Sequence, residues 1–144
     1  MELSEWLAQA PALLNATTFA AVYLARESNG TSMGRYAESC MMNALEDWND
    51  EPEPQYRAVM WVPPAATWIS IAGKTIFCLC KTNYNRKDYT QPGPWGKGSG
   101  YSMERWTFWK QRFTVIGNSE GFDGSVRHFA TRAAEEMNEI ERGA

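Results

Sequence analysis

The residues best suited to chemistry lie in one short segment, residues 101–112, where acidic and basic side chains alternate with tryptophans. Glu104 stands beside these tryptophans, and a carboxyl group in such a setting can act as a general acid or base. Arg105 and Trp109 are four residues apart, so on a helix the cation can lie over the ring face. The segment predicts either an aromatic and cationic wall that binds a ligand, or a helix with a buried tryptophan face and a solvated basic face. The second arrangement is the commoner one.

Two further residues complete the candidates for acid–base catalysis. His128, the only histidine, adjoins an apolar stripe and can take up a proton near neutral pH. A single histidine on a helix is more often a surface or packing residue. Tyr101 comes just before the charged segment. The candidate ligand-binding residues are Trp61, Trp68, Trp95, Arg105, Trp106 and Trp109.

The cysteines Cys40, Cys78 and Cys80 do not have the spacing of zinc ligands, so we expect neither a metal nor a cofactor. We expect reduced, buried thiols in a cytoplasmic protein. The N-terminus lacks the basic region of a signal peptide. The longest apolar stretch, residues 58–80, is interrupted by prolines and a lysine, which favours a core helix over a membrane span. We therefore expect no membrane partner.

The chain has 144 residues, enough for one domain, and a net charge of -3 that weighs against a nucleic-acid partner. Residues 36–56 carry six acids and no base, whereas residues 57–112 carry nine bases and two acids. We expect these segments to neutralise one another in the fold. Aromatic residues make up 13% of the chain, and seven are tryptophans, which predicts a large aromatic core.

Apolar residues recur at helical spacing and no alternating strand pattern of useful length is present, so the sequence predicts a single all-α domain over residues 1–144. We expect a bundle of about five helices. In order, the predicted elements are a short helical turn over 3–9, helices over 17–27, 31–48, 63–80, 102–116 and 125–140, and an exposed acidic connection over 49–56.

Three details of this prediction bear on function. The face formed by Phe19, Val22 and Tyr23 is expected to be the inner face of the first helix. The third helix is apolar on most sides and should lie at the centre, beginning at Pro63-Pro64, because proline is tolerated in a first turn. Residues 82–100 form a long loop rich in glycine and proline, which could serve as a lid over a pocket.

Parts of the sequence resemble a known family. The segments that carry the resemblance are LNATTFAAVYLA, VPPAATWISIAGKTIF, GSGYSMERWTFWKQRF and VRHFATRAAEEMNEIE, which together span about residues 13–142. They are similar to segments of the fungal domain-of-unknown-function 3632 family, whose members are generally longer at the N-terminus. The most specific part is the string ERW-x-x-W-K-x-R-F. The resemblance implies a helical fungal protein and implies no activity.

Two functional hypotheses follow. In the first, the aromatic interior lines a pocket for an apolar small molecule, and any catalysis is of a cofactor-independent isomerase or cyclase type. In the second, the chain is a non-catalytic interaction or homo-oligomerisation module that uses exposed Trp, Tyr, Met and Arg side chains. A solid core around Trp68, Trp106 and Trp109 would rule out the pocket as the first hypothesis places it.

Overall fold

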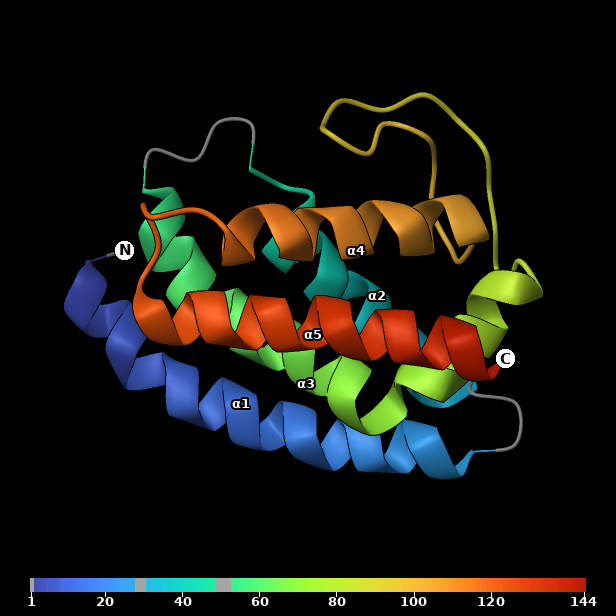
Figure 1. The fold of residues 1–144 in the computed structure, drawn as a ribbon, viewed down its shortest axis with the longest axis horizontal. Helices are drawn as coiled ribbons and strands as arrows, with labels where there is room; N and C mark the ends of the chain where they lie inside the picture. Colours follow the sequence, from blue (N-terminus) through green and yellow to red (C-terminus); the bar gives the residue numbers. More distant parts are fainter. Residues whose placement is uncertain (1, 28–30, 49–52) are drawn as a thin grey trace.

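The structure is a computed structural model that describes residues 2–27, 31–48 and 53–144. Five helices account for most of these residues (Figure 1). They are α1 (Leu3–Arg26), α2 (Thr31–Leu45), α3 (Pro54–Lys81), α4 (Met103–Gly117) and α5 (Gly124–Gly143). The only β pairing within the described ranges is one isolated bridge between Lys87 and Ser99. The predicted all-α class is confirmed.

The central element is α3, which contacts each of the other four helices. α1 and α5 pack against it, α2 packs against both α1 and α3, and α4 lies along α5. The sequence of α3 is apolar on most sides of the helix, and this agrees with its central place in the bundle.

The beginning of α3 differs from the prediction. The helix starts at Pro54, nine residues before Pro63-Pro64, so residues 54–56 form its first turn and not an exposed connection. Residues 49–52 of that predicted connection lie outside the described residues. Both later prolines sit inside the helix, and its non-helical residue is Ala72, with φ of -119° and ψ of 16°. The bend occurs where α5 comes close: a Cβ atom on Gly73 would lie 2.5 Å from Ile140 Cδ1.

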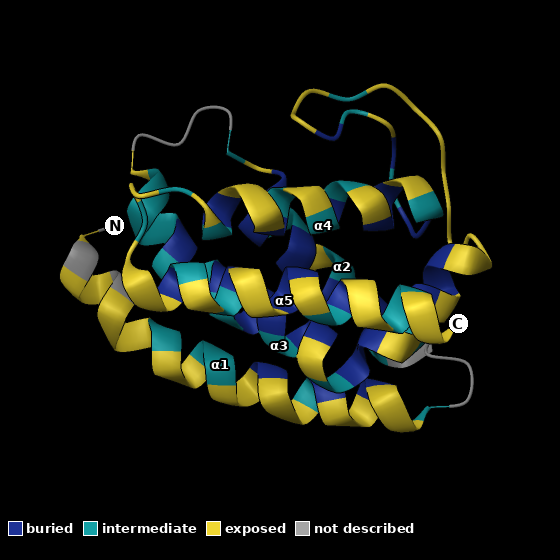
Figure 2. Cartoon of the chain, in the orientation of Figure 1, coloured by how far each residue is buried: buried dark blue, intermediate teal, exposed yellow. Residues whose placement is uncertain are grey.

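The N-terminal prediction is also wrong, because α1 is one continuous helix that runs through Pro11. Proline removes one backbone donor, but alanine and leucine, which favour helix, flank it on both sides. The buried face of α1 carries Thr17, Ala21 and Leu24. The apolar face around Phe19, which we expected to point inward, instead faces solvent (Figure 2).

Two other boundaries shift by a few residues. α2 ends at Leu45, three residues before the predicted end at Trp48. α5 begins at Gly124, one residue before the predicted start, and ends at Gly143, three residues after the predicted end. It is capped by Asp123, whose carboxylate accepts a hydrogen bond from the Ser125 N–H at 3.2 Å. α4 is capped by Ser102, whose hydroxyl accepts from the Arg105 N–H at 3.1 Å.

All three cysteines are free, but only two are buried. Burial raises the pKa of the Cys40 and Cys80 thiols to about 12 in each case. Cys78 is exposed, contrary to the prediction. Two helical segments, Leu7–Arg26 and Pro54–Lys81, are long and apolar enough to cross a membrane by length and composition alone, and much of the second is buried in the bundle.

Candidate functional site

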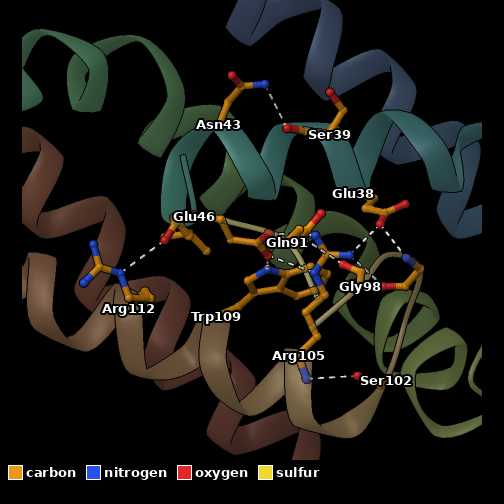
Figure 3. Close-up of polar contacts among 12 residues, drawn as sticks. Glu38, Ser39, Asn43, Glu46, Gln91, Gly98, Ser102, Arg105, Trp109 and Arg112 are labelled. Carbon is orange, nitrogen blue, oxygen red and sulfur yellow. Dashed lines mark hydrogen bonds and ion pairs between the residues drawn. The ribbon is translucent and has the colours of Figure 1, made fainter. Parts of the chain in front are cut away.

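The segment with the most chemical potential forms a buried ionic cluster between α2 and α4 (Figure 3). Arg105 on α4 is 1% exposed and points at Glu46, the first residue after the end of α2, which is 3% exposed. The guanidinium donates to both carboxylate oxygens: Nη2 to Oε1 at 2.7 Å and Nε to Oε2 at 2.8 Å. This bidentate geometry is the strongest form of the Arg–carboxylate pair. Burial alone would lower the pKa of Arg105, but the hydrogen bonds and charges of Glu46 and Glu38 raise it above its usual value.

Glu38 lies on α2, eight residues before Glu46. Its carboxylate contacts both the Arg105 guanidinium and the end of the loop between α3 and α4 (residues 82–102), which we call the interhelical loop. Its Oε2 atom accepts from Arg105 Nη1 at 2.5 Å and from the Gly100 N–H at 2.6 Å. The Gly100 carbonyl in turn accepts from Arg105 Nη1 at 2.8 Å. Arg105 therefore joins α2, α4 and the loop through hydrogen bonds that leave few of its donors unused.

Trp109 lies four residues after Arg105, and Arg112 lies three residues after Trp109, so all three side chains face the C-terminal end of α2. The Trp109 indole N–H donates to Glu46 Oε2 at 2.6 Å, and Arg112 Nε donates to the Leu45 carbonyl at 3.2 Å. Three residues of the ERW-x-x-W-K-x-R-F string thus make the hydrogen bonds between α4 and the end of α2, a contact that we call the joint between α2 and α4. The predicted solvated basic face is wrong at Arg105, because its charge is neutralised inside the core by Glu38 and Glu46.

The remaining tryptophan of this helix is also core. Trp106 is 0% exposed and packs edge-on against Phe77, with ring centroids 4.9 Å apart. Its Nε1 atom has no hydrogen-bond partner and is the one such buried side-chain atom in the described part of the chain. Neither Trp106 nor Trp109 lines a described cavity. Trp106 and Trp109 are therefore core side chains in the described part of the chain.

The three predicted acid–base residues lie in three different settings. The Tyr101 hydroxyl is buried and donates to the Gly34 carbonyl at 2.5 Å, and burial raises the pKa of Tyr101 above its usual value. Glu104 is exposed on the outer side of α4, 3.7 Å from Lys97. His128 is exposed on α5. These positions bring together no acid–base pair.

Residues 82–102, which connect α3 to α4 without helix, wall a polar pocket of about 400 Å³. Trp95 and Glu104 line it, and Trp95 is nearly buried against Phe108, with ring centroids 5.4 Å apart. The charged residues around this pocket are already paired with one another: Arg86 with Asp88 at 2.8 Å, and Lys97 with Glu104. The pocket therefore holds no surplus charge for a ligand.

A second hollow, of about 410 Å³, lies where α1, α2 and α3 meet, and we call it the α1–α2–α3 groove. Its lining residues are Leu13, Ala16, Thr17, Ala20, Met33, Tyr36, Ser39, Cys40, Trp61 and Trp68. Trp68 is 2% exposed, whereas Trp61 is half-buried and Tyr36 is exposed. Two of the predicted ligand-binding tryptophans thus line an apolar hollow.

Sequence reasoning missed Glu38 and Glu46 as site residues. The signal that points to them is the acidic segment 36–56, which had been expected to neutralise the basic segment after it. Arg105 paired with both glutamates shows one place where this happens. Among the described residues, no group of three or more His, Cys, Asp or Glu side chains could hold a metal ion.

Comparison with known proteins gives one match. The model of the family described as "Protein of unknown function (DUF3632)" matches residues 2–113, which include α1, α2, α3 and the first three turns of α4. No curated protein and no solved structure matches the chain. Because the match covers more than half of its length, and both the Arg105–Glu46 pair and the α1–α2–α3 groove lie inside it, the chain belongs to the DUF3632 family.

Proposed function

We propose that this protein binds an uncharged, largely apolar small molecule in the α1–α2–α3 groove. The observation that carries the proposal is the lining: two tryptophans of α3 face apolar side chains of α1 and α2 across a hollow of about 410 Å³. Small-molecule sites are typically concave, mainly apolar and about 300–1,000 Å³ in volume.

The lining also limits the chemistry of the ligand. None of the groove residues is a Lys, Arg, Asp, Glu or His, so a charged ligand group would lose its water without gaining a partner. The hydroxyls of Thr17 and Ser39 offer hydrogen bonds to one or two polar groups. A neutral molecule with an aromatic or aliphatic body fits this arrangement best.

The proposal is for binding and not for catalysis. Glu104, Tyr101 and His128 all lie outside the groove, and no residue of the loop over 82–102 lines it. The proposed binding site therefore includes neither the loop over 82–102 as a lid nor any of the three candidate acid–base residues. Buried, free Cys40 and Cys80 suit a reducing compartment, and we propose the cytoplasm as the place of binding.

The test uses Nile red, a neutral apolar dye, with the full chain. We expect its fluorescence to rise on binding, and the indole N–H resonance of Trp68, assigned with a Trp68→Phe variant, to shift. Ala16 is exposed and lines the groove, so Ala16→Phe should fill the space and weaken binding by about tenfold or more.

Thr107→Phe is the matched control, because residue 107 is exposed on α4 and lies outside the groove. It should leave the dissociation constant unchanged. Equal affinity in the Ala16→Phe and Thr107→Phe variants would place the dye elsewhere and refute the proposal, as would a lack of any binding by the parent chain.

A further inference from the structure

α1 carries a second stripe on the side that faces away from the bundle (Figure 2). Its members are spaced alternately by three and four residues, and all are exposed. We call them the outer seam of α1: Glu5, Ala8, Ala12, Asn15, Phe19, Val22 and Arg26. Spacings of three and four residues in alternation are those of the contact positions of a coiled coil.

The outer seam is unusual for a surface helix. Residues 6–25 include no charged side chain, although the face toward the bundle is already formed by Thr17, Ala21 and Leu24. Phe19 is 75% exposed and Tyr23 beside it is 49% exposed. A helix that is apolar on all sides is normally covered on all sides, so this one lacks a partner on its outer side.

We propose that a second copy of this chain covers the outer seam, with the two α1 helices antiparallel across a two-fold axis. Charge argues for this partner, because Glu5 ends the seam at one side and Arg26 ends it at the other. Antiparallel pairing brings each glutamate near the arginine of the other copy, whereas parallel pairing places like charges together.

Side-chain size supports the same orientation. The N-terminal half of the seam is small, with Ala8 and Ala12, and the C-terminal half is large, with Phe19 and Val22. An antiparallel partner sets the large half of each helix on the small half of the other. Asn15 then lies near the two-fold axis, and a polar residue at such a position favours one register over others.

A lipid membrane is the alternative partner for an apolar helix, since the segment Leu7–Arg26 is long and apolar enough to cross one by length and composition alone. The observations favour a second copy, because Asn15 interrupts the apolar stripe and the opposite charges at the ends match the same helix reversed. The seam shares no residue with the α1–α2–α3 groove, so this inference does not depend on the proposed function.

The first experiment measures the mass of the full chain by sedimentation equilibrium over micromolar to hundred-micromolar concentrations. We expect a dimer, and Phe19→Glu should raise its dissociation constant by about a hundredfold or more. Val115→Glu is the matched control, since Val115 is a large apolar residue of α4 that is 49% exposed and lies outside the seam. It should leave the dimer intact.

The second experiment tests the orientation by charge reversal. Glu5→Arg alone and Arg26→Glu alone should each weaken the dimer by about tenfold, and the double variant should recover the parent affinity. The Glu5 carboxylate also caps α1 by accepting from the Glu2 N–H at 2.8 Å. The Glu5→Arg variant and the double variant lose this cap equally, so recovery of affinity between these two reports on pairing. Circular dichroism checks that each variant is folded.

Three results would overturn the inference. One is a monomer at every concentration, and another is a double charge-reversal variant that is weaker than either single variant. The third is a monomer that co-sediments with vesicles of a neutral phosphatidylcholine and loses that binding on Phe19→Glu, which would make the seam a lipid-facing surface.

Discussion

Both carboxylate oxygens of Glu46 accept hydrogen bonds from the Arg105 guanidinium, although the two residues are 59 positions apart in the sequence. The pair is almost completely shielded from water, with exposures of 3% and 1%. Each charge has lost its hydration, so the stability of the joint between α2 and α4 depends on both partners being present.

Removing one partner should therefore be costly. We expect Glu46→Leu to lower the free energy of unfolding by about 3–5 kcal/mol, because Arg105 stays buried with only Glu38 to balance it. Urea unfolding followed by circular dichroism gives the value. Arg132→Met is the control: its pair with Glu136 is 60% exposed on the arginine side, and losing it should cost less than about 1 kcal/mol. A loss below that limit for Glu46→Leu would show that the buried pair does not hold the joint.

Two tryptophans of α4 allow a comparison at constant volume. Trp109 donates its indole N–H to Glu46, whereas the indole N–H of equally buried Trp106 has no partner. Both change by the same volume on replacement with Phe, but only Trp109→Phe loses a hydrogen bond to a charged group. We expect Trp109→Phe to be the more destabilising by about 1.5–3 kcal/mol in urea unfolding. Equal losses would mean that the charged hydrogen bond contributes nothing to stability.

The sequence predicts the periodic features of this fold well, because helix formation and the apolar surround of α3 are local properties. It predicts poorly whether the Arg105 side chain is buried or exposed. Helical spacing puts Arg105 beside Trp109, but whether that side of α4 meets solvent or α2 depends on residues 59 and 67 positions away. A charged residue without a visible partner is assigned to the surface, since charges are rarely buried unless paired.

The outer side of α1 was misjudged for a related reason. Phe19 and Val22 form a clear apolar stripe, and an apolar stripe normally marks the core side of a helix. α1 has a second apolar stripe, around Ala21 and Leu24, and the bundle uses that one. The periodicity of a helix that is apolar on two sides does not reveal which side the bundle covers.

The end of the interhelical loop depends on one glycine. Gly100 has φ of +82°, and a Cβ atom there would lie 2.1 Å from the Asn85 carbonyl oxygen. We expect Gly100→Ala to destabilise the protein by about 2–4 kcal/mol, since the shift would also disturb its hydrogen bonds to Glu38 and Arg105.

Gly124→Ala is the control for this change, because a Cβ atom on Gly124 meets nothing within 4 Å. Residue 124 is the first of α5, so alanine there should be neutral or stabilising by up to about 1 kcal/mol. Thermal unfolding of both variants decides the matter. If Gly100→Ala unfolds at the temperature of the parent, the loop must be free to move away from Asn85.

Stability should fall at alkaline pH because two thiols are held in the core. Burial raises the pKa of Cys40 and Cys80 to about 12 from a usual value of 9.0, so the folded state keeps these protons where the unfolded state releases them. Their contribution is complete below about pH 9 and is lost as the pH rises from there to about 12. Each thiol should lower the free energy of unfolding by about 1.4 kcal/mol per pH unit within that window.

Urea unfolding at intervals between pH 7 and pH 11 measures this slope. We expect Cys80→Ala to reduce it by about 1.4 kcal/mol per pH unit above pH 9, whatever the variant does to stability at neutral pH. A slope that is the same in the Cys80→Ala variant and the parent would show that water reaches the Cys80 thiol in the folded protein, since only a thiol shielded from water resists ionisation more strongly when folded than when unfolded.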